Sequence, residues 1–165
     1  MKRLVDPLLA EFNHEAHTTR RLLERLPDDK LGWKPHEKSM TLGKLATHLA
    51  EIPAFFTSVL VDETTPAGGG AARPAATTRD EILAAFEGAN ARFTAALGER
   101  TDAQMLERWR FVRGEQVIVE LPRVAAVRAL VLSHSIHHRG QLSVYLRLLD
   151  IPVPRIYGPS ADEPM

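Results

Sequence analysis

Histidine is the residue type in this sequence best suited to chemistry, and three histidines fall within five residues. The segment HSIHH contains His134, His137 and His138, and His48 stands alone in LATHLAEIP. In an α-helix, residues i and i+4 lie one turn apart on the same face, so His134 and His138 can bind one cation through neutral imidazoles. His134 and His137 have i, i+3 spacing, which permits the same arrangement, so spacing alone leaves the pair open.

The helical faces favour His134 with His138. These two share the apolar stripe of their predicted helix, whereas His137 lies toward its edge. His48 lies on the inward face of another predicted helix. Burying an imidazole without partners costs free energy, and one metal ion would satisfy all three. The same pattern also fits histidines that form separate hydrogen bonds or line a wet cleft.

Four amphipathic helices are predicted to position these residues, because apolar residues recur at helical spacing in four segments. Asp6 and Thr41 are expected N-caps, and Thr78 with Glu81 has the spacing of a capping box. Pro53 lies inside the second helix and should bend it. The predicted helices span residues 7–26, 41–59, 78–98 and 122–149.

Two connections carry further signals. Residues 62–77 are rich in Gly, Pro and Ala and are expected to form a loop. Around Arg113-Gly114, two runs alternate apolar and polar residues, which indicates a β-hairpin. We therefore expect an all-α chain, a four-helix bundle with long connections and a small β-hairpin between the third and fourth helices. Residues 1–165 should form a single domain.

Composition excludes several classes of function. The 165 residues include 21 Lys and Arg against 21 Asp and Glu, so no net charge favours nucleic acid or an anionic membrane. The sequence has no cysteine, which excludes disulfides and thiolate ligands. No signal-like or membrane-spanning apolar run is present. We expect a cytoplasmic protein.

Two long segments resemble the DinB/YfiT-like superfamily of four-helix-bundle metalloenzymes. They are WKPHEKSMTLGKLATHLAEIPAFF and LPRVAAVRALVLSHSIHHRGQLSVYLRLLDIPVP, and the resemblance covers most of the chain. It implies that His48, His134 and His138 bind one divalent metal ion, zinc or nickel, with water in the remaining positions. Members include bacillithiol and mycothiol S-transferases and a mycothiol-dependent maleylpyruvate isomerase. The resemblance also implies a small-molecule substrate, a low-molecular-weight thiol and a homodimer.

Five further residues are candidates for binding the substrate or thiol. Arg139 can bind an anionic group or form a structural salt bridge, and Gln141 and Tyr145 can reach the metal pocket or serve as core polar groups. Asn13 and His17 are four residues apart on the first helix and can face the cavity or solvent. We expect a metal-dependent transferase, or a hydrolase. A non-catalytic metal-binding or ligand-sensing bundle is the alternative.

Overall fold

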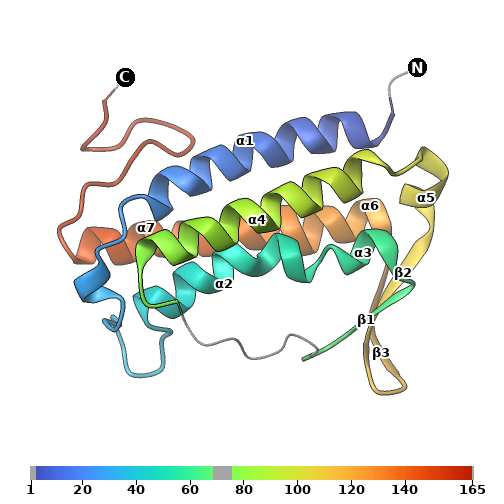
Figure 1. Cartoon of the computed structure of the whole chain (residues 1–165), viewed down its shortest axis with the longest axis horizontal. Coiled ribbons are helices and arrows are strands. Elements are labelled where there is room, and N and C mark those ends of the chain that lie inside the picture. Colours follow the sequence, from blue (N-terminus) through green and yellow to red (C-terminus); the bar gives the residue numbers. More distant parts are fainter. Residues whose placement is uncertain (1–2, 69–75, 165) are drawn as a thin grey trace.

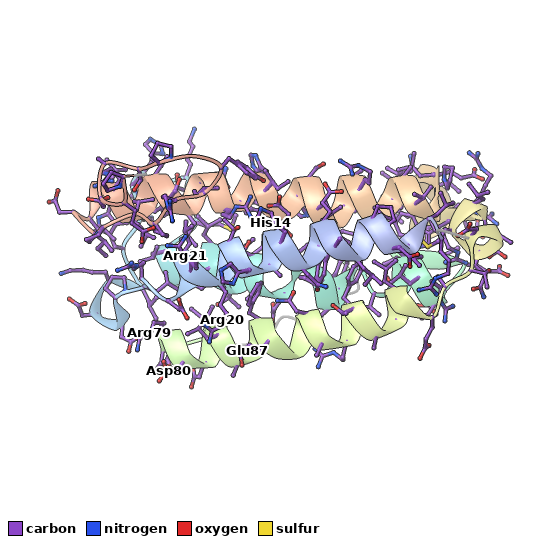
Figure 2. All side chains as sticks on the ribbon, turned by 90° about the horizontal axis from the view of Figure 1, so that it is seen from above. His14, Arg20, Arg21, Arg79, Asp80 and Glu87 are labelled. Carbon is purple, nitrogen blue, oxygen red and sulfur yellow. The ribbon has the colours of Figure 1, made fainter. Side chains whose placement is uncertain are left out.

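Long helices lie side by side in this chain, and a small β-sheet lies at one end of them (Figure 1). The computed structural model describes residues 3–68 and 76–164. Helix α2 contacts α4 and α7, and helix α1 also contacts α4 and α7. Seen from above, α1 runs between α4 and α7 (Figure 2). The long helical elements are α1 (Val5–Leu23), α2 (Leu42–Phe55), α4 (Arg79–Gly98) and α7 (His134–Leu148).

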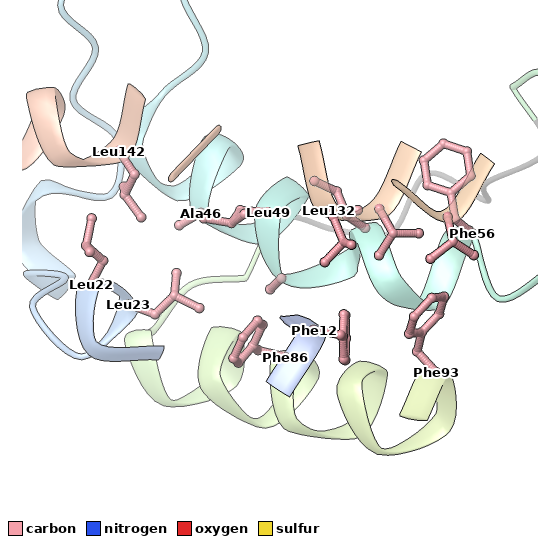
Figure 3. Packing of buried hydrophobic residues seen from close by; sticks show 14 of the residues in the cluster. Phe12, Leu22, Leu23, Ala46, Leu49, Phe56, Phe86, Phe93, Leu132 and Leu142 are labelled. Carbon is pink, nitrogen blue, oxygen red and sulfur yellow. The ribbon is translucent and has the colours of Figure 1, made fainter. Parts of the chain in front are cut away.

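The core lies between these helices and consists of the residues that the helical spacing predicts. Phe12 of α1 packs against Phe93 of α4, with ring centroids 4.7 Å apart (Figure 3). Every apolar position predicted to face inward on the second and third helices is buried. The predicted apolar faces are therefore confirmed. These positions are Leu42, Leu45, Leu49, Ile52, Phe56, Val59, Ile82, Phe86, Ala89, Phe93 and Leu97.

The predicted starts of the second and third helices are confirmed. The Thr41 side chain accepts a hydrogen bond from the Lys44 backbone N–H, and Thr78 and Glu81 form a reciprocal capping box. The prediction that Asp6 caps the first helix was wrong, because α1 begins at Val5. The Asp6 carboxylate instead lies in the first turn, where it accepts a hydrogen bond from the Arg3 backbone N–H.

Helix α2 continues through Pro53 rather than ending there. Helix α2 ends at Phe55, and a separate short helix α3 (Ser58–Val61) follows. The Thr57 hydroxyl donates to the Pro53 carbonyl at 2.8 Å, and the Ser58 hydroxyl donates to the Phe55 carbonyl at 3.1 Å. Proline removes the bond to the Leu49 carbonyl, upstream of this break, so the end of α2 coincides with the two hydroxyl bonds and not with the missing N–H.

The chain is mostly helical, as predicted, but it is not all-α. Strands β2 (Arg108–Arg113) and β3 (Gln116–Pro122) form the predicted antiparallel hairpin, and β1 (Thr64–Pro66) adds a parallel strand beside β2. The prediction of a loop over 62–77 was therefore wrong at β1, and its residues 69–75 lie outside the described residues. The buried Trp109 indole N–H donates to the Thr65 hydroxyl at 3.0 Å, which fixes β1 against β2.

The last long helical run is not the uniform α-helix that the sequence predicts. It consists of α6 (Arg123–Ala126), a π-helical segment η2 (Val127–Ser133) and α7. A π-helix is rare and is frequently found next to functional residues. Within the described residues there are also a 3₁₀ turn η1 (Asp28–Lys30) and a short helix α5 (Asp102–Leu106). No helix in the described part of the chain is long and apolar enough to cross a membrane.

Candidate metal centre

Three histidines from two helices meet where α2 contacts α7. His48 of α2 faces His134 and His138 of α7, and one ligand atom from each residue lies within 4.8 Å of the other two. The Nε2 atoms of His48 and His134 are 3.3 Å apart, and those of His134 and His138 are 2.9 Å apart. The i, i+4 spacing places His134 and His138 one turn apart on the same helix face, so both rings reach α2.

These separations fit a single metal ion. Two nitrogens that bind one zinc ion at about 2.0–2.1 Å with a tetrahedral angle lie about 3.3 Å apart. The observed Nε2 separations, 3.3 and 2.9 Å, fall close to that value. Imidazole nitrogen is a common ligand for zinc and nickel. The donor set and its geometry therefore match a site for a divalent ion.

Gln141 fixes the tautomer of His138. The Gln141 side-chain oxygen accepts a hydrogen bond from His138 Nδ1 at 2.7 Å. An oxygen acceptor requires a proton on Nδ1, which leaves Nε2 with a free lone pair directed at His134. Such a hydrogen bond behind a metal-binding histidine fixes its ring orientation and raises its basicity as a ligand.

The surroundings keep the three imidazoles neutral. Burial, followed by the nearby His138 and His134, lowers the pKa of His48 to about 4. Burial is also the largest cause that lowers the pKa of His134 and of His138. Since only the neutral ring can bind a metal through a lone pair, all three histidines are ready to act as ligands near neutral pH.

The cluster is only partly buried. His138 is 7% exposed, whereas His48 and His134 are half-buried. The Phe56 ring lies beside the cluster, with its centroid 6.1 Å from that of His134. His137 contacts the His138 ring at a centroid distance of 4.9 Å, but its side chain is exposed and it is not part of the three-histidine group.

Arg139 points away from the histidine cluster. Its guanidinium is 1% exposed and forms an ion pair with Glu15 of α1 at 2.5 Å. It also donates to the Glu15 carbonyl at 3.0 Å and to the Tyr157 hydroxyl. This is the geometry of a structural salt bridge. Glu15 and Tyr157 were not singled out from the sequence, because neither has a spacing that relates it to the histidines.

The other candidate residues are distributed over two regions. The Tyr145 hydroxyl donates to the Met40 carbonyl at 3.3 Å, and its ring meets Trp33 edge-on at a centroid distance of 5.7 Å. Asn13 and His17 are both exposed on α1. His17 lines a separate pocket formed with the C-terminal tail, which is described below.

The fold and the site together define a class: a mostly helical protein with a cluster of three histidines between two helices. A family model described as the DinB family matches residues 1–164. The chain therefore belongs to the DinB family.

Individual proteins are similar to this chain in sequence or in structure. The chain is 30% identical over 164 residues to the uncharacterized protein YrdA of Bacillus subtilis strain 168, covering 99% of this chain and 93% of YrdA. A DinB-like protein from Bacillus cereus has a similar crystal structure, with a TM-score of 0.73, 25% identity, and coverage of 90% and 95% of the two chains. The fold of a second DinB-like protein, YjoA of Bacillus subtilis, is also similar, with a TM-score of 0.71, 21% identity, and coverage of 89% and 96%.

Proposed function

We propose that this protein binds one divalent metal ion, zinc or nickel, through His48, His134 and His138. The observation that carries the proposal is the convergence of three neutral imidazoles, with Nε2 separations of 3.3 and 2.9 Å. Structural zinc sites usually take four ligands from the protein, whereas catalytic sites take three and leave a position open. Three histidine ligands on a helical bundle therefore favour a reactive site over a purely structural one.

We further propose that the protein is a metal-dependent transferase that acts on a small molecule with a low-molecular-weight thiol. A bound divalent ion would lower the pKa of an incoming thiol and so favour the nucleophilic thiolate. The chain has no cysteine, so the thiol must come from solution. His48 and His134 are half-buried rather than enclosed, which leaves this face accessible.

The role of the protein side chains is to place and tune the ligands. Gln141 holds the His138 ring with Nε2 toward the other two histidines. Phe56 places an apolar ring edge-on beside His134, which lowers the polarity on that side of the cluster. Tyr145 is proposed to shape the substrate pocket through its packing on Trp33, and Arg139 is proposed to hold α7 against α1 through its ion pair with Glu15.

A non-catalytic metal-binding or ligand-sensing protein is the second candidate. It is favoured by the identity of the polar side chain bonded to the cluster, because the Gln141 amide does not titrate and cannot act as a general base.

Cobalt-substituted protein tests the thiol proposal. Coordination of a thiolate adds a charge-transfer absorption band, so titration with bacillithiol, mycothiol or glutathione should produce that band with saturation. S-methylglutathione is the matched control, since its sulfur cannot ionise. If none of the three thiols changes the spectrum of the cobalt protein, thiol transfer is wrong and simple metal binding or hydrolysis replaces it.

We also propose a cytoplasmic homodimer. Val144 and Leu148 lie one turn apart on α7 and are 55% and 58% exposed. An apolar pair on a helix surface suits an isologous contact, in which the same patch of each subunit faces the other. Light scattering across micromolar concentrations should give twice the 18.3 kDa chain mass. A Val144→Lys/Leu148→Lys variant should be monomeric, and a monomeric wild type would contradict the proposal.

A further inference from the structure

A second concave region lies between α1 and the C-terminal tail, and it shares no residue with the histidine cluster. It has a volume of about 290 Å³. Small-molecule sites commonly begin at about 300 Å³, so this pocket has room for a compact ligand. Its α1 wall includes His14, His17 and Arg21, and its tail wall includes Arg155, Ile156 and Pro159.

The tail wall is fixed in place by a buried ion pair behind it, to which the largely exposed Tyr157 is bonded. Tyr157, between the lining residues Ile156 and Gly158, donates its hydroxyl to Glu15 at 2.9 Å. The Arg139 guanidinium lies over the Tyr157 ring, 4.9 Å from its centroid. Arg139 and Glu15 are buried between α1 and α7. Their contacts with Tyr157 therefore fix this part of the tail to the two helices.

The charges around the pocket are mainly positive. Arg21 and Arg25 both form ion pairs with Glu163, at 2.5 and 3.3 Å, and the Arg155 side chain lies 3.9 Å from the same carboxylate. One carboxylate is therefore shared by three guanidinium groups, so this group of side chains carries two uncompensated positive charges. The chain itself shows that these arginines can bind a carboxylate.

Two histidines lie beside these arginines along α1. His14 and His17 are exposed and three residues apart, so they lie on neighbouring positions of one helix face. In the part of the chain that the structure describes, neither imidazole has a hydrogen-bond partner. His14 and Arg21 can be located on α1 in Figure 2. The ring nitrogens of both histidines are thus available to a ligand in the pocket.

We propose that the pocket between α1 and the tail binds a small organic anion. Its carboxylate or phosphate group contacts Arg21 and Arg155 from the pocket side, beside Glu163, which already lies between these two arginines. Its remaining atoms contact His14, His17 and the apolar Ile156 and Pro159. Guanidinium groups bind both kinds of oxyanion through paired hydrogen bonds, which accounts for two arginines at one end of the pocket. The site is separate from the metal centre and does not depend on the function proposed for it.

Histidine-labelled protein tests this proposal by nuclear magnetic resonance. The seven imidazoles give separate ring signals, and inorganic phosphate and succinate are titrated in turn into the protein as purified. Saturable shifts are expected for His14 and His17 and not for His36, which lies in an exposed loop. The probe that saturates at the lower concentration shows whether the site prefers phosphate or carboxylate.

Variants decide whether the named residues bind the anion. Arg155→Gln should weaken binding of the better probe at least about tenfold, while the backbone N–H of Arg155 still binds Glu163 at 3.0 Å and holds the tail. His14→Ala/His17→Ala should weaken it at least about threefold. Arg113→Gln on the exposed hairpin is the charge-matched control and should leave the affinity unchanged.

Three results would overturn the proposal. The first is that neither phosphate nor succinate gives saturable shifts at His14 or His17. The second is that Arg155→Gln and Arg113→Gln weaken binding equally, which would show only a general effect of charge. The third is that removing the metal with a chelator abolishes the shifts, which would place the anion at the metal centre. Retained binding in metal-free protein supports a separate site.

Discussion

Two groups of histidines lie in separate regions of this molecule, and their surroundings suit them to opposite kinds of ligand. Between α2 and α7, three histidines converge in a partly buried site, and burial holds the pKa of His48 near 4. Between α1 and the tail, His14 and His17 are exposed beside arginines. The first environment supplies neutral lone pairs for a cation, and the second supplies positive charge for an anion. Residue type alone does not separate these two roles.

The largest effect should follow the loss of one imidazole from the cluster. His48→Ala should reduce metal affinity at least about 1,000-fold, because changes to groups that merely support a ligand already cost about 10–100-fold. Elemental analysis should show stoichiometric metal in wild type and almost none in the variant. His14→Ala, from the other region, is the matched control and should retain all of the metal. Full occupancy in His48→Ala would remove the basis for a site shared by two helices.

Much of the first region could be predicted from the sequence, and little of the second. The i, i+4 spacing of His134 and His138 and the inward face of His48 depend on local periodicity, which the sequence displays directly. The pocket depends on Tyr157 and Glu163 returning to α1 from a non-helical tail, more than 130 residues away in sequence. No periodic pattern encodes such a contact.

In the fold, too, the features that depend on local sequence periodicity could be predicted, and those that depend on distant contacts could not. Apolar spacing predicted the long helices and their buried faces, and alternation predicted the hairpin. The strand β1 was missed because three residues, Thr64–Pro66, carry no alternation of their own, and their pairing depends on Trp109. The π-helical segment was missed because its sequence, VRALVLS, has the composition of an ordinary helix.

Removing the buried ion pair between Arg139 and Glu15 should have the next largest effect, on the stability of the fold. Arg139→Met leaves Glu15 buried without its charged partner, which should lower the free energy of unfolding by about 3–5 kcal/mol. Urea denaturation measures this. Arg128→Met, which removes an exposed pair with Glu11, is the control and should cost less than about 1 kcal/mol. Equal effects of the two variants would mean that burial of the Arg139 pair does not matter.

A smaller effect, on metal affinity, is expected from the loss of the hydrogen bond between Gln141 and His138. Gln141→Leu removes the acceptor that fixes the His138 tautomer and should weaken metal binding about tenfold. Competition with a chelator of known affinity measures this change. His137→Ala is the neighbouring control, since His137 touches the same ring without belonging to the cluster, and it should bind metal as tightly as wild type. The reverse ranking would show that His137, and not Gln141, supports the ligand.

The two regions should lose their contributions to stability in different pH ranges as the solution is acidified. The pKa of His48 is lowered in the folded state, mainly by burial, so between pH 6.5 and about 4 the unfolded chain binds more protons than the folded chain. Metal-free protein should therefore lose stability progressively as the pH falls from 7 to 5. The pKa of Glu163 is lowered by the Arg155 backbone N–H and by Arg21, so its contribution is retained in that range and lost only below about pH 4.5.

Urea unfolding of chelator-treated protein at pH 7, 6 and 5 measures this difference. His48→Gln should show a shallower loss of stability than wild type across these three values. Glu163→Gln should show the same slope as wild type, although its stability at every pH is lower. If both variants have the wild-type slope, the histidine cluster does not titrate in this range.

The π-helical segment η2 gives the last long helical run one residue more than a continuous α-helix would need. Each residue of an α-helix turns the chain by about 100°, and a π-helical turn accommodates one residue more than an α-helical turn. Arg123, before this segment, donates to the Val59 and Asp62 carbonyls, while His134, after it, faces His48. The wide turn absorbs one residue, so an α-helix with one residue fewer would join the same two contacts. Deleting a single residue between positions 127 and 133 should therefore turn the segment into ordinary α-helix and keep both the Arg123 contacts and the histidine cluster.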